Sequence, residues 1–138
     1  MATTHELLDR FVNLFNDNRI ADVEQDYAAD GYAEESGTNR RLTPKENVAN
    51  GEAWKKAFPD AQGTITSKIV DGNRGAAEIT WRGTNTGPLM GQPATGKAVT
   101  VHAAVFIETN GSQVTRSRHY LDVAGMMAQL GNAPAASV

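Results

Sequence analysis

Four long segments in the second half of the sequence have the character of β-strands, and they restrict the possible folds more than any other feature. They are residues 63–70, 74–85, 97–109 and 113–121. Turn signals at 71–73 and 110–111, both of which contain Asn and Gly, indicate hairpins between neighbouring strands. In the segment 97–109, apolar residues occupy both faces of the alternation. This pattern predicts a sheet that is covered on both sides.

The first half of the sequence has a helical pattern. Thr3 and Glu6 have the spacing of a capping box, and the helix that they begin has an apolar stripe over residues 7–15. A second start signal at 43–46 combines an N-cap threonine, a proline and a glutamate, and it predicts a helix that ends at about Phe58. Weaker patterns predict a short helix over 20–29, a short strand over 32–36 and an amphipathic helix over 123–130.

Helices followed by strands indicate an α+β fold, in which helices pack on one face of a curved, largely antiparallel sheet. We expect one domain over residues 1–131 and a mobile tail over 132–138. A curved sheet with helices on its concave side encloses a cavity, which is the usual place for a ligand. The apolar residues on the other face predict a partner, most simply a second copy of the chain in a homodimer.

Composition excludes several classes of function. Lys and Arg number 13 against 16 Asp and Glu, so the net charge of −3 does not indicate a nucleic-acid surface. The chain has no cysteine, which excludes disulfides and a thiolate zinc site, and its three histidines lack metal spacing. No G-x-S-x-G motif supports a serine nucleophile. Without an apolar run of 18 residues or an apolar signal core, we expect no membrane segment and a cytoplasmic location.

Three motifs resemble those of the SnoaL-like polyketide cyclases. Residues 81–97 read WRGTNTGPLMGQPATGK, which is similar to the family pattern W-x-G-T-H-T-G-x-x-x-G-x-P-x-T-G-[KR]. Residues 118–122, RHYLD, run into MMAQLG at 126–131 and match the ending of the family. Phe58-Pro59-Asp60 is a third, shorter match. The helical first half fits the family in layout.

The resemblance implies a cone-shaped, nuclear-transport-factor-2-like fold, which ketosteroid isomerase, scytalone dehydratase and limonene epoxide hydrolase share. These enzymes place different side chains in the same cavity, so the fold does not name the reaction. The characterised cyclases perform an intramolecular aldol condensation on an aromatic polyketide ester. They use no metal or cofactor, and a single side chain acts as acid and base. The resemblance therefore implies a hydrophobic small-molecule ligand and no cofactor.

His119 is the first candidate for a catalytic residue. In the cyclases the terminal strand reads R-D-W-x-D, and its first Asp is the acid/base; the corresponding residue here is His119. An imidazole titrates near neutrality, so it can take and return a proton. Alternation places residues 115, 117, 119 and 121 on one face of the strand. The alternative is a core histidine satisfied by one hydrogen bond.

Glu34 and Asp122 are the other candidates for catalytic residues. Glu34 falls near a family position that lines the cavity, where a carboxylate could act as base or orient His119. The alternative for Glu34 is a solvated acidic edge. Asp122 corresponds to the second Asp of the cyclase motif. Its alternative is structural, because a side chain at that point can cap the last helix.

Several large apolar residues could line an aromatic-ligand pocket, although such residues are more often core. The candidates are Phe15, Trp54, Trp81, Met90, Ala103 and Val105. If Val101, Ala103 and Val105 face the cavity, His102 lies on the opposite face of the strand and points outward. Two positions depart from the cyclases, since their pocket Tyr corresponds to Phe15 and their pocket Asn to Gly51.

Three functions fit these observations. The first is an enzyme that acts on a hydrophobic, carbonyl-bearing molecule by proton transfer, as a cyclase, isomerase or dehydratase. The second is a hydrolase that opens an epoxide or lactone with a water activated in the same cavity. The third is a non-catalytic module that binds a small molecule or serves as an interaction domain, which predicts a filled cavity or site residues that point away from it.

Overall fold

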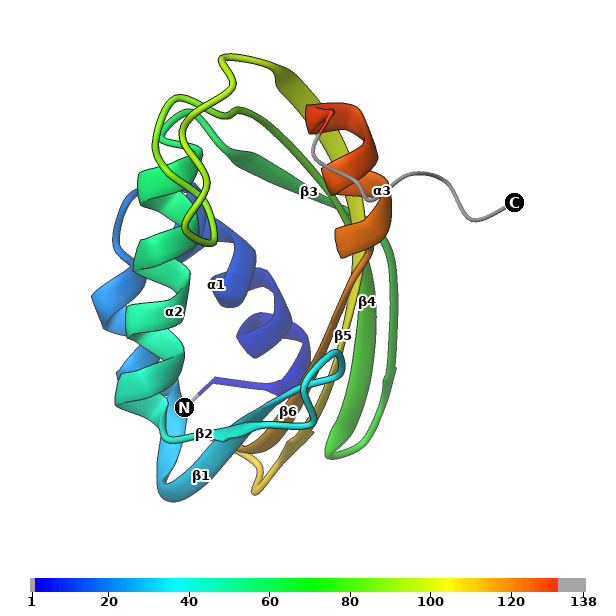
Figure 1. The fold of residues 1–138 in the computed structure, drawn as a ribbon. Coiled ribbons are helices and arrows are strands. Elements are labelled where there is room, and N and C mark those ends of the chain that lie inside the picture. Colours follow the sequence, from blue (N-terminus) through cyan, green and yellow to red (C-terminus); the bar gives the residue numbers. More distant parts are fainter. Residues whose placement is uncertain (1, 132–138) are drawn as a thin grey trace.

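A six-stranded sheet curves around helix α1 (Thr4–Asn16), and helix α2 (Pro44–Ala57) lies on the same side of the sheet (Figure 1). The computed structural model describes residues 2–131, so the predicted mobile tail over 132–138 lies outside the described residues. A third helix, α3 (Val123–Leu130), follows the last strand and covers one end of the sheet. This is the α+β architecture that the sequence predicts.

Both long helices begin at the predicted capping boxes. The Thr3 hydroxyl accepts from the backbone N–H of Glu6, and the Thr43 hydroxyl accepts from that of Glu46. The carboxylate of each glutamate in turn accepts from the backbone N–H of its threonine. These contacts satisfy N–H groups that the first turn leaves without partners. The helix starts were therefore predictable from local sequence.

The strands form one mixed sheet. Their bounds are β1 Tyr27–Glu35, β2 Arg41–Leu42, β3 Gln62–Asp71, β4 Arg74–Thr84, β5 Ala98–Thr109 and β6 Val114–Leu121. The spatial order is β2-β1-β6-β5-β4-β3, and β3 to β6 pair with antiparallel neighbours as predicted. The pair of β1 and β6 is parallel. A sequence-based prediction of antiparallel hairpins does not detect this pair, because its strands lie far apart in the chain.

The predicted helix over 20–29 is too long. A short 3₁₀ helix, η1 (Ile20–Asp26), ends where β1 begins at Tyr27. Tyr27 pairs with Val114 on β6, and its phenol oxygen lies 2.6 Å from the hydroxyl oxygen of Ser117 on the same strand. These long-range contacts override the local helical pattern, and β1 is correspondingly longer than the predicted strand over 32–36.

The core has two parts. One lies between α1 and the strands and includes Leu8, Val105 and Ile107. The other lies between the end of α2, the segment 85–97 and α3. The Phe15 and Trp81 side chains contact both parts, and their ring centroids lie 4.7 Å apart. Across residues 2–131, no helix is both long and apolar enough to span a membrane.

Asn85 holds the segment 85–97 in place. Its side chain is 1 % exposed, and its amide nitrogen donates to the carbonyl oxygens of Ala57 and Gly87. Its amide oxygen accepts from the backbone N–H and the hydroxyl of Thr95. Gly87 lies so close to the Lys56 carbonyl that a Cβ has no room there. The longest family-like motif therefore builds a loop that closes one end of the cone.

Candidate functional site

His119 lies on β6 with its imidazole on the face of the sheet that the helices cover. Ser117 shares this face, as the strand alternation predicts. The ring of Phe11 on α1 packs against the imidazole, with 5.3 Å between the ring centroids. His119 is therefore partly buried between α1 and the sheet, on the concave side where we expect a cavity.

A chain of hydrogen bonds leads from His119 to helix α2. The Nε2 atom of His119 lies 2.8 Å from the Ser117 hydroxyl oxygen, which is bonded in turn to the Tyr27 phenol. The side-chain amide of Asn47 donates to the phenol oxygen over 3.3 Å. Ser117 and Tyr27 are only 1 % and 6 % exposed. Water therefore does not compete with these bonds, and they hold one edge of the imidazole in place.

The opposite edge of the imidazole is free. Within residues 2–131, no group makes a hydrogen bond to Nδ1 of His119, and every side-chain nitrogen or oxygen without a partner is accessible to solvent. Nδ1 is therefore accessible to a ligand while Nε2 remains bonded to Ser117.

Burial lowers the pKa of His119 from 6.5 to about 4. Glu35, the residue beside His119 on β1, raises this pKa by attraction, but the desolvation effect is larger. His119 is thus neutral at pH 7, and the expectation that it titrates near neutrality is wrong. A neutral imidazole still has one N–H donor and one acceptor, so it retains both functions of an acid/base group.

The cavity beside His119 is small. Its volume is about 20 Å³, and its lining combines apolar side chains of α1, β5 and β6 with Asp26, Tyr27, Ser117 and His119. This volume accommodates about one water molecule. Pockets for organic ligands measure roughly 300–1,000 Å³. A larger ligand therefore has to displace side chains such as Phe11 or bind where the cavity meets the surface.

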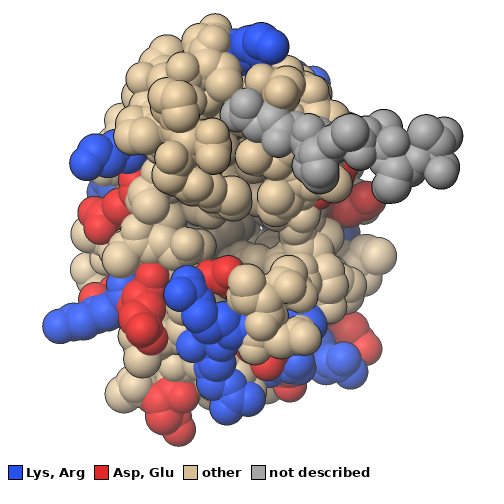
Figure 2. All heavy atoms as spheres, in the orientation of Figure 1, with Lys and Arg blue, Asp and Glu red and all other residues tan. Residues whose placement is uncertain are grey.

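The surface is hollowed on the side where the helices face the sheet (Figure 2). In the matching orientation of Figure 1, this hollow lies between α2 and α3, above the connection of β1 to β2. Uncharged atoms dominate the region above the hollow, whereas Lys, Arg, Asp and Glu gather below it. An uncharged border of this kind favours a ligand without charged groups.

Glu34 does not line this cavity. It lies on the opposite face of the sheet, where its carboxylate accepts from Arg116 Nε over 2.7 Å and lies 3.6 Å from Arg118. The bond to Arg116 lowers the pKa of Glu34 below its ordinary value. The expectation that Glu34 lines the cavity is therefore wrong, because one residue along a strand reverses the face. Glu35 shares the face of His119 and instead pairs with Arg40 over 2.9 Å.

Asp122 performs the structural role that the sequence suggested as its alternative. It is the N-cap of α3, and its carboxylate accepts from the backbone N–H of Gly125 over 2.9 Å. The side chain is exposed and does not belong to the lining of the cavity beside His119. It positions the turn between β6 and α3.

The predicted apolar lining is divided between the cavity and the core. Val105 lines the cavity, and Ala103 lies on the same face of β5, where it pairs with Leu121. Phe15 and Trp81 pack at the junction of the two core parts. His102 points to the outer face, as the alternation predicts, with Nδ1 3.4 Å from the Thr80 hydroxyl.

Trp54 and Met90 lie away from the cavity beside His119. The Trp54 ring stacks with Phe58 at the end of α2, with 6.4 Å between the ring centroids. Met90 is 58 % exposed in the segment 85–97 and adopts a left-handed backbone with φ of 50°.

Tyr27 and Asn47 are site residues that were not predicted from the sequence. Burial raises the pKa of the Tyr27 phenol to about 12, so this group remains protonated. Tyr27 was assigned to a helix, which concealed its place beside β6. The alternation did place Ser117 on the face of His119, and a small hydroxyl two residues before a candidate histidine was the available signal.

Two other observations limit the chemistry. In the described chain, 2–131, no three His, Cys, Asp or Glu side chains are grouped as metal ligands would be. Lys55 is buried, and its ammonium donates to the Ala61 carbonyl over 2.8 Å. Burial lowers the pKa of Lys55, and its ammonium also lies 4.7 Å from the centre of the Phe15 ring. Lys55 therefore stabilises the end of α2.

Comparison with known proteins agrees with this architecture. The family model of the SnoaL-like polyketide cyclases matches residues 5–130. No protein of curated function matches the sequence.

Solved structures show the same fold at low identity. AclR from Streptomyces galilaeus, a candidate hydroxylase, has a TM-score of 0.83 and 23 % identity, covering 93 % of this chain and 84 % of its own. IdmH from Streptomyces antibioticus, a candidate polyketide cyclase, has a TM-score of 0.82 and 19 % identity, covering 92 % and 97 %. A protein of ketosteroid isomerase-like fold from Catenulispora acidiphila has a TM-score of 0.78 and 17 % identity, covering 96 % of both chains.

Proposed function

The chain belongs to the SnoaL-like polyketide cyclase family, and we propose that it is an enzyme that acts on a hydrophobic, carbonyl-bearing small molecule by proton transfer. His119 is the acid/base group, and no cofactor takes part. The reaction is an intramolecular aldol cyclisation of the polyketide cyclase type, or a related isomerisation or dehydration.

One observation carries this proposal: His119 is held through Nε2 and is open at Nδ1. A fixed ring with one free nitrogen can meet a carbonyl group in a defined geometry, which proton transfer requires. Phe11 and Val105 beside the ring exclude water from part of the site. Hydrogen bonds to the reacting oxygen are stronger in such surroundings than in water.

The test compares turnover by the natural chain and by His119→Gln on a panel of compounds. The panel contains a polyketide-like β-keto ester, a ketosteroid, an epoxide and a lactone. His102→Gln is the matched control, because it makes the same change on the outer face of the sheet. We expect His119→Gln to lose at least about 100-fold in kcat/KM, which is a typical contribution of one acid/base group. Undiminished turnover in His119→Gln contradicts the proposal.

A second candidate function is a non-catalytic module that serves as an interaction domain or binds a small molecule. The cavity volume of about 20 Å³ favours the interaction domain, because an interior nearly filled by side chains leaves little room for an organic ligand. Calorimetry with the same panel separates the two candidates. Binding without turnover supports the module. Turnover of the epoxide or the lactone alone indicates instead that the one-water cavity activates a water for hydrolysis.

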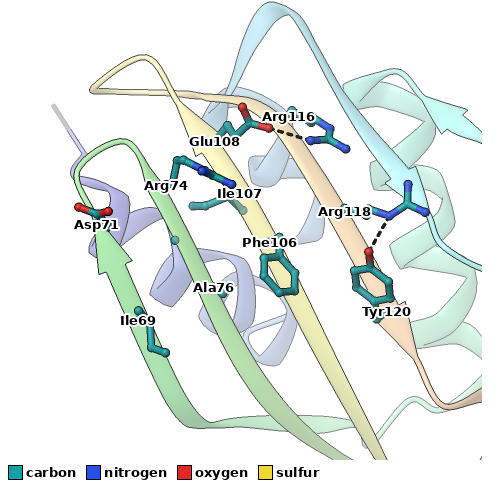
Figure 3. Close-up of a pocket in the computed structure, with 11 residues that line it drawn as sticks. Ile69, Asp71, Arg74, Ala76, Phe106, Ile107, Glu108, Arg116, Arg118 and Tyr120 are labelled. Carbon is teal, nitrogen blue, oxygen red and sulfur yellow. Dashed lines mark hydrogen bonds and ion pairs between the residues drawn. The ribbon is translucent and has the colours of Figure 1, made fainter.

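We also propose that the chain forms a homodimer through the outer face of the sheet. Large apolar side chains are exposed there, since Ile69, Phe106 and Tyr120 are 70 %, 53 % and 41 % exposed. They lie along a hollow of about 440 Å³ on the face away from the helices (Figure 3). Charged residues of both signs share its lining: Asp71, Arg74, Glu108, Arg116 and Arg118.

A second copy fits this face because the face carries both signs of charge. A two-fold axis brings each patch against its own copy, so acidic groups of one chain can meet arginines of the other. Sedimentation velocity tests the dimer. We expect Phe106→Asp to be monomeric, and Met90→Asp, which changes an equally exposed apolar residue elsewhere, to remain dimeric. A monomeric natural chain overturns this proposal.

A further inference from the structure

The direction of each hydrogen bond between Asn47 and His119 follows from the donors available. The Asn47 amide nitrogen can only donate hydrogen bonds, so the Tyr27 phenol oxygen accepts from it. The phenol has one hydrogen of its own. Among residues 2–131, its remaining partner is the Ser117 hydroxyl oxygen, 2.6 Å away. Tyr27 is 6 % exposed, and an unpaired buried hydroxyl hydrogen is unfavourable, so the phenol donates to Ser117.

The direction of the hydrogen bond between Ser117 and the His119 imidazole follows in the same way. The Ser117 hydroxyl accepts from Tyr27, and its own hydrogen has His119 Nε2 as its neighbour at 2.8 Å. Ser117 is 1 % exposed, so water offers no alternative. Ser117 therefore donates, and Nε2 of His119 accepts. A neutral imidazole carries one hydrogen, which then lies on Nδ1.

We propose that Asn47, Tyr27 and Ser117 are positioning residues that hold neutral His119 in the tautomer protonated at Nδ1. The solvent-accessible Nδ1–H then meets a ligand as a hydrogen-bond donor, and the group that it recognises is a carbonyl or enolate oxygen. This inference rests on the proposed function for its consequence, because it states which part of acid/base chemistry the resting histidine is prepared for. The tautomer itself does not depend on that function.

The charges around the imidazole are compatible with a neutral donor. Glu35 on β1 and Asp26 in the cavity lining are the acidic groups on this face, and Glu35 is paired with Arg40. Asp26 accepts from Arg10 over 2.8 Å. Both carboxylates share their charge with an arginine, and the attraction of Glu35 for a second proton on the ring is smaller than the desolvation effect. The low pKa of His119 agrees with this.

The experiment reads the tautomer directly by ¹⁵N NMR of the full chain labelled at histidine, at pH 7 and without ligand. We expect the natural chain to show a protonated Nδ1 and an unprotonated Nε2 for His119. Asn47→Asp replaces the donor to the Tyr27 phenol by an acceptor, because an ionised carboxylate can only accept hydrogen bonds. The Tyr27 phenol then donates to the introduced carboxylate and accepts from Ser117, and the proton of His119 moves to Nε2.

Asn50→Asp is the matched control. It adds the same charge to α2, at a residue that makes no hydrogen bond to Tyr27, Ser117 or His119. We expect it to leave the tautomer unchanged. Ser117→Ala removes the contact to Nε2, and we expect a mixture of tautomers in a folded protein. A natural chain protonated at Nε2, or an unaltered tautomer in Asn47→Asp, overturns the inference.

A ligand measurement keeps this result separate from the proposed function. We expect a ketone from the panel to bind at least 10-fold more weakly to Asn47→Asp than to Asn50→Asp, because Nδ1 no longer donates. Equal binding by these two variants contradicts the carbonyl-recognition part of the inference. Absence of turnover in every protein, with the tautomers as expected, contradicts the proposed function and leaves the positioning role intact.

Discussion

The two faces of strand β6 accommodate polar side chains in opposite ways. On the inner face, Ser117 and His119 form neutral hydrogen bonds under α1, and the pKa of the histidine is lowered. On the outer face, Arg116 binds both Glu34 and Glu108, at 2.7 and 2.8 Å, in the region that Figure 3 shows. These residues alternate within one short strand. Exposure to water, not position in the chain, separates the two kinds of polar group.

This difference has a simple physical origin. On the inner face, a charge on the His119 ring loses its hydration, and the attraction of Glu35 does not compensate for this loss, so the neutral form prevails. A charge on the outer face keeps part of its hydration, and ion pairs there are inexpensive but weak. Changes on the inner face should therefore alter stability and chemistry far more than changes on the outer face.

The largest expected effect comes from moving a charge to the inner face. Ser117→Arg places a guanidinium beside Tyr27 and His119, where the site is 1 % exposed. We expect the free energy of unfolding to fall by about 4 kcal/mol or more. Urea denaturation followed by circular dichroism measures this. The reciprocal change Arg116→Ser should cost less than about 1 kcal/mol, and similar losses for both variants contradict the comparison.

The next effect is a pH dependence specific to the inner face. The pKa of His119 is about 4 in the folded chain and 6.5 as its ordinary value. The unfolded chain therefore binds more protons between these values, and stability decreases as pH falls from about 6.5 to about 4. We expect His119 to contribute on the order of 2 kcal/mol to this loss.

The contribution of His119 is obtained as a difference between two proteins, because carboxylates titrate in part of the same range. Unfolding by urea at a series of pH values is compared for the natural chain and for His119→Gln. The variant should lack the loss between pH 6.5 and 4. If the free energy of unfolding falls with pH in parallel for the two proteins, the imidazole is not desolvated.

A smaller effect follows from removing the Ser117 hydroxyl, which joins Tyr27 to His119 on the inner face of the sheet. Ser117→Ala leaves the hydrogen of the Tyr27 phenol and the Nε2 atom of His119 without a partner, which should cost about 1–2 kcal/mol. Ser67→Ala on the exposed side of β3 is the control, with an expected change within about 0.5 kcal/mol. Thermal unfolding measures the loss of stability in both variants. Equal losses for the two serines contradict the expectation that the hydrogen bonds of Ser117 to Tyr27 and His119 stabilise the fold.

The smallest effect belongs to the outer ion pairs. Arg116→Ala removes the contacts to Glu34 and Glu108, and the arginine side chain is 41 % exposed. We expect a loss below about 1 kcal/mol at low salt that nearly disappears in 1 M salt. A double-mutant cycle with Glu34→Ala gives the pair energy. A loss that salt does not alter indicates that the outer network is buried, for example in the proposed dimer.

Much of the fold was predictable because its signals are local. The capping boxes at Thr3 and Thr43 set two helix starts, and the turn signals at 71–73 and 110–111 separate strands that the structure shows as antiparallel neighbours. The segment 81–97 indicated the family, and in the structure it is a loop held by the buried side chain of Asn85, which stands where the family pattern has His.

The site was predictable only in part. Alternation along β6 was enough to place His119 on the face of Ser117, since side-chain direction in a strand has a period of two. Glu34 was placed on the wrong face, because a family position transfers to a strand only if the register is known to the residue. Tyr27 and Asn47 come from segments 90 and 70 residues before Ser117, so no local pattern relates them to it.

The sequence by itself determined the α+β class, the helix starts, the family and the candidate histidine, because each depends on neighbours within a few residues. Only the tertiary structure decided that β1 and β6 pair in parallel, that the Tyr27 phenol reaches Ser117, and that burial keeps His119 neutral. Those properties arise from desolvation and from contacts between distant segments. They do not exist until the chain has folded.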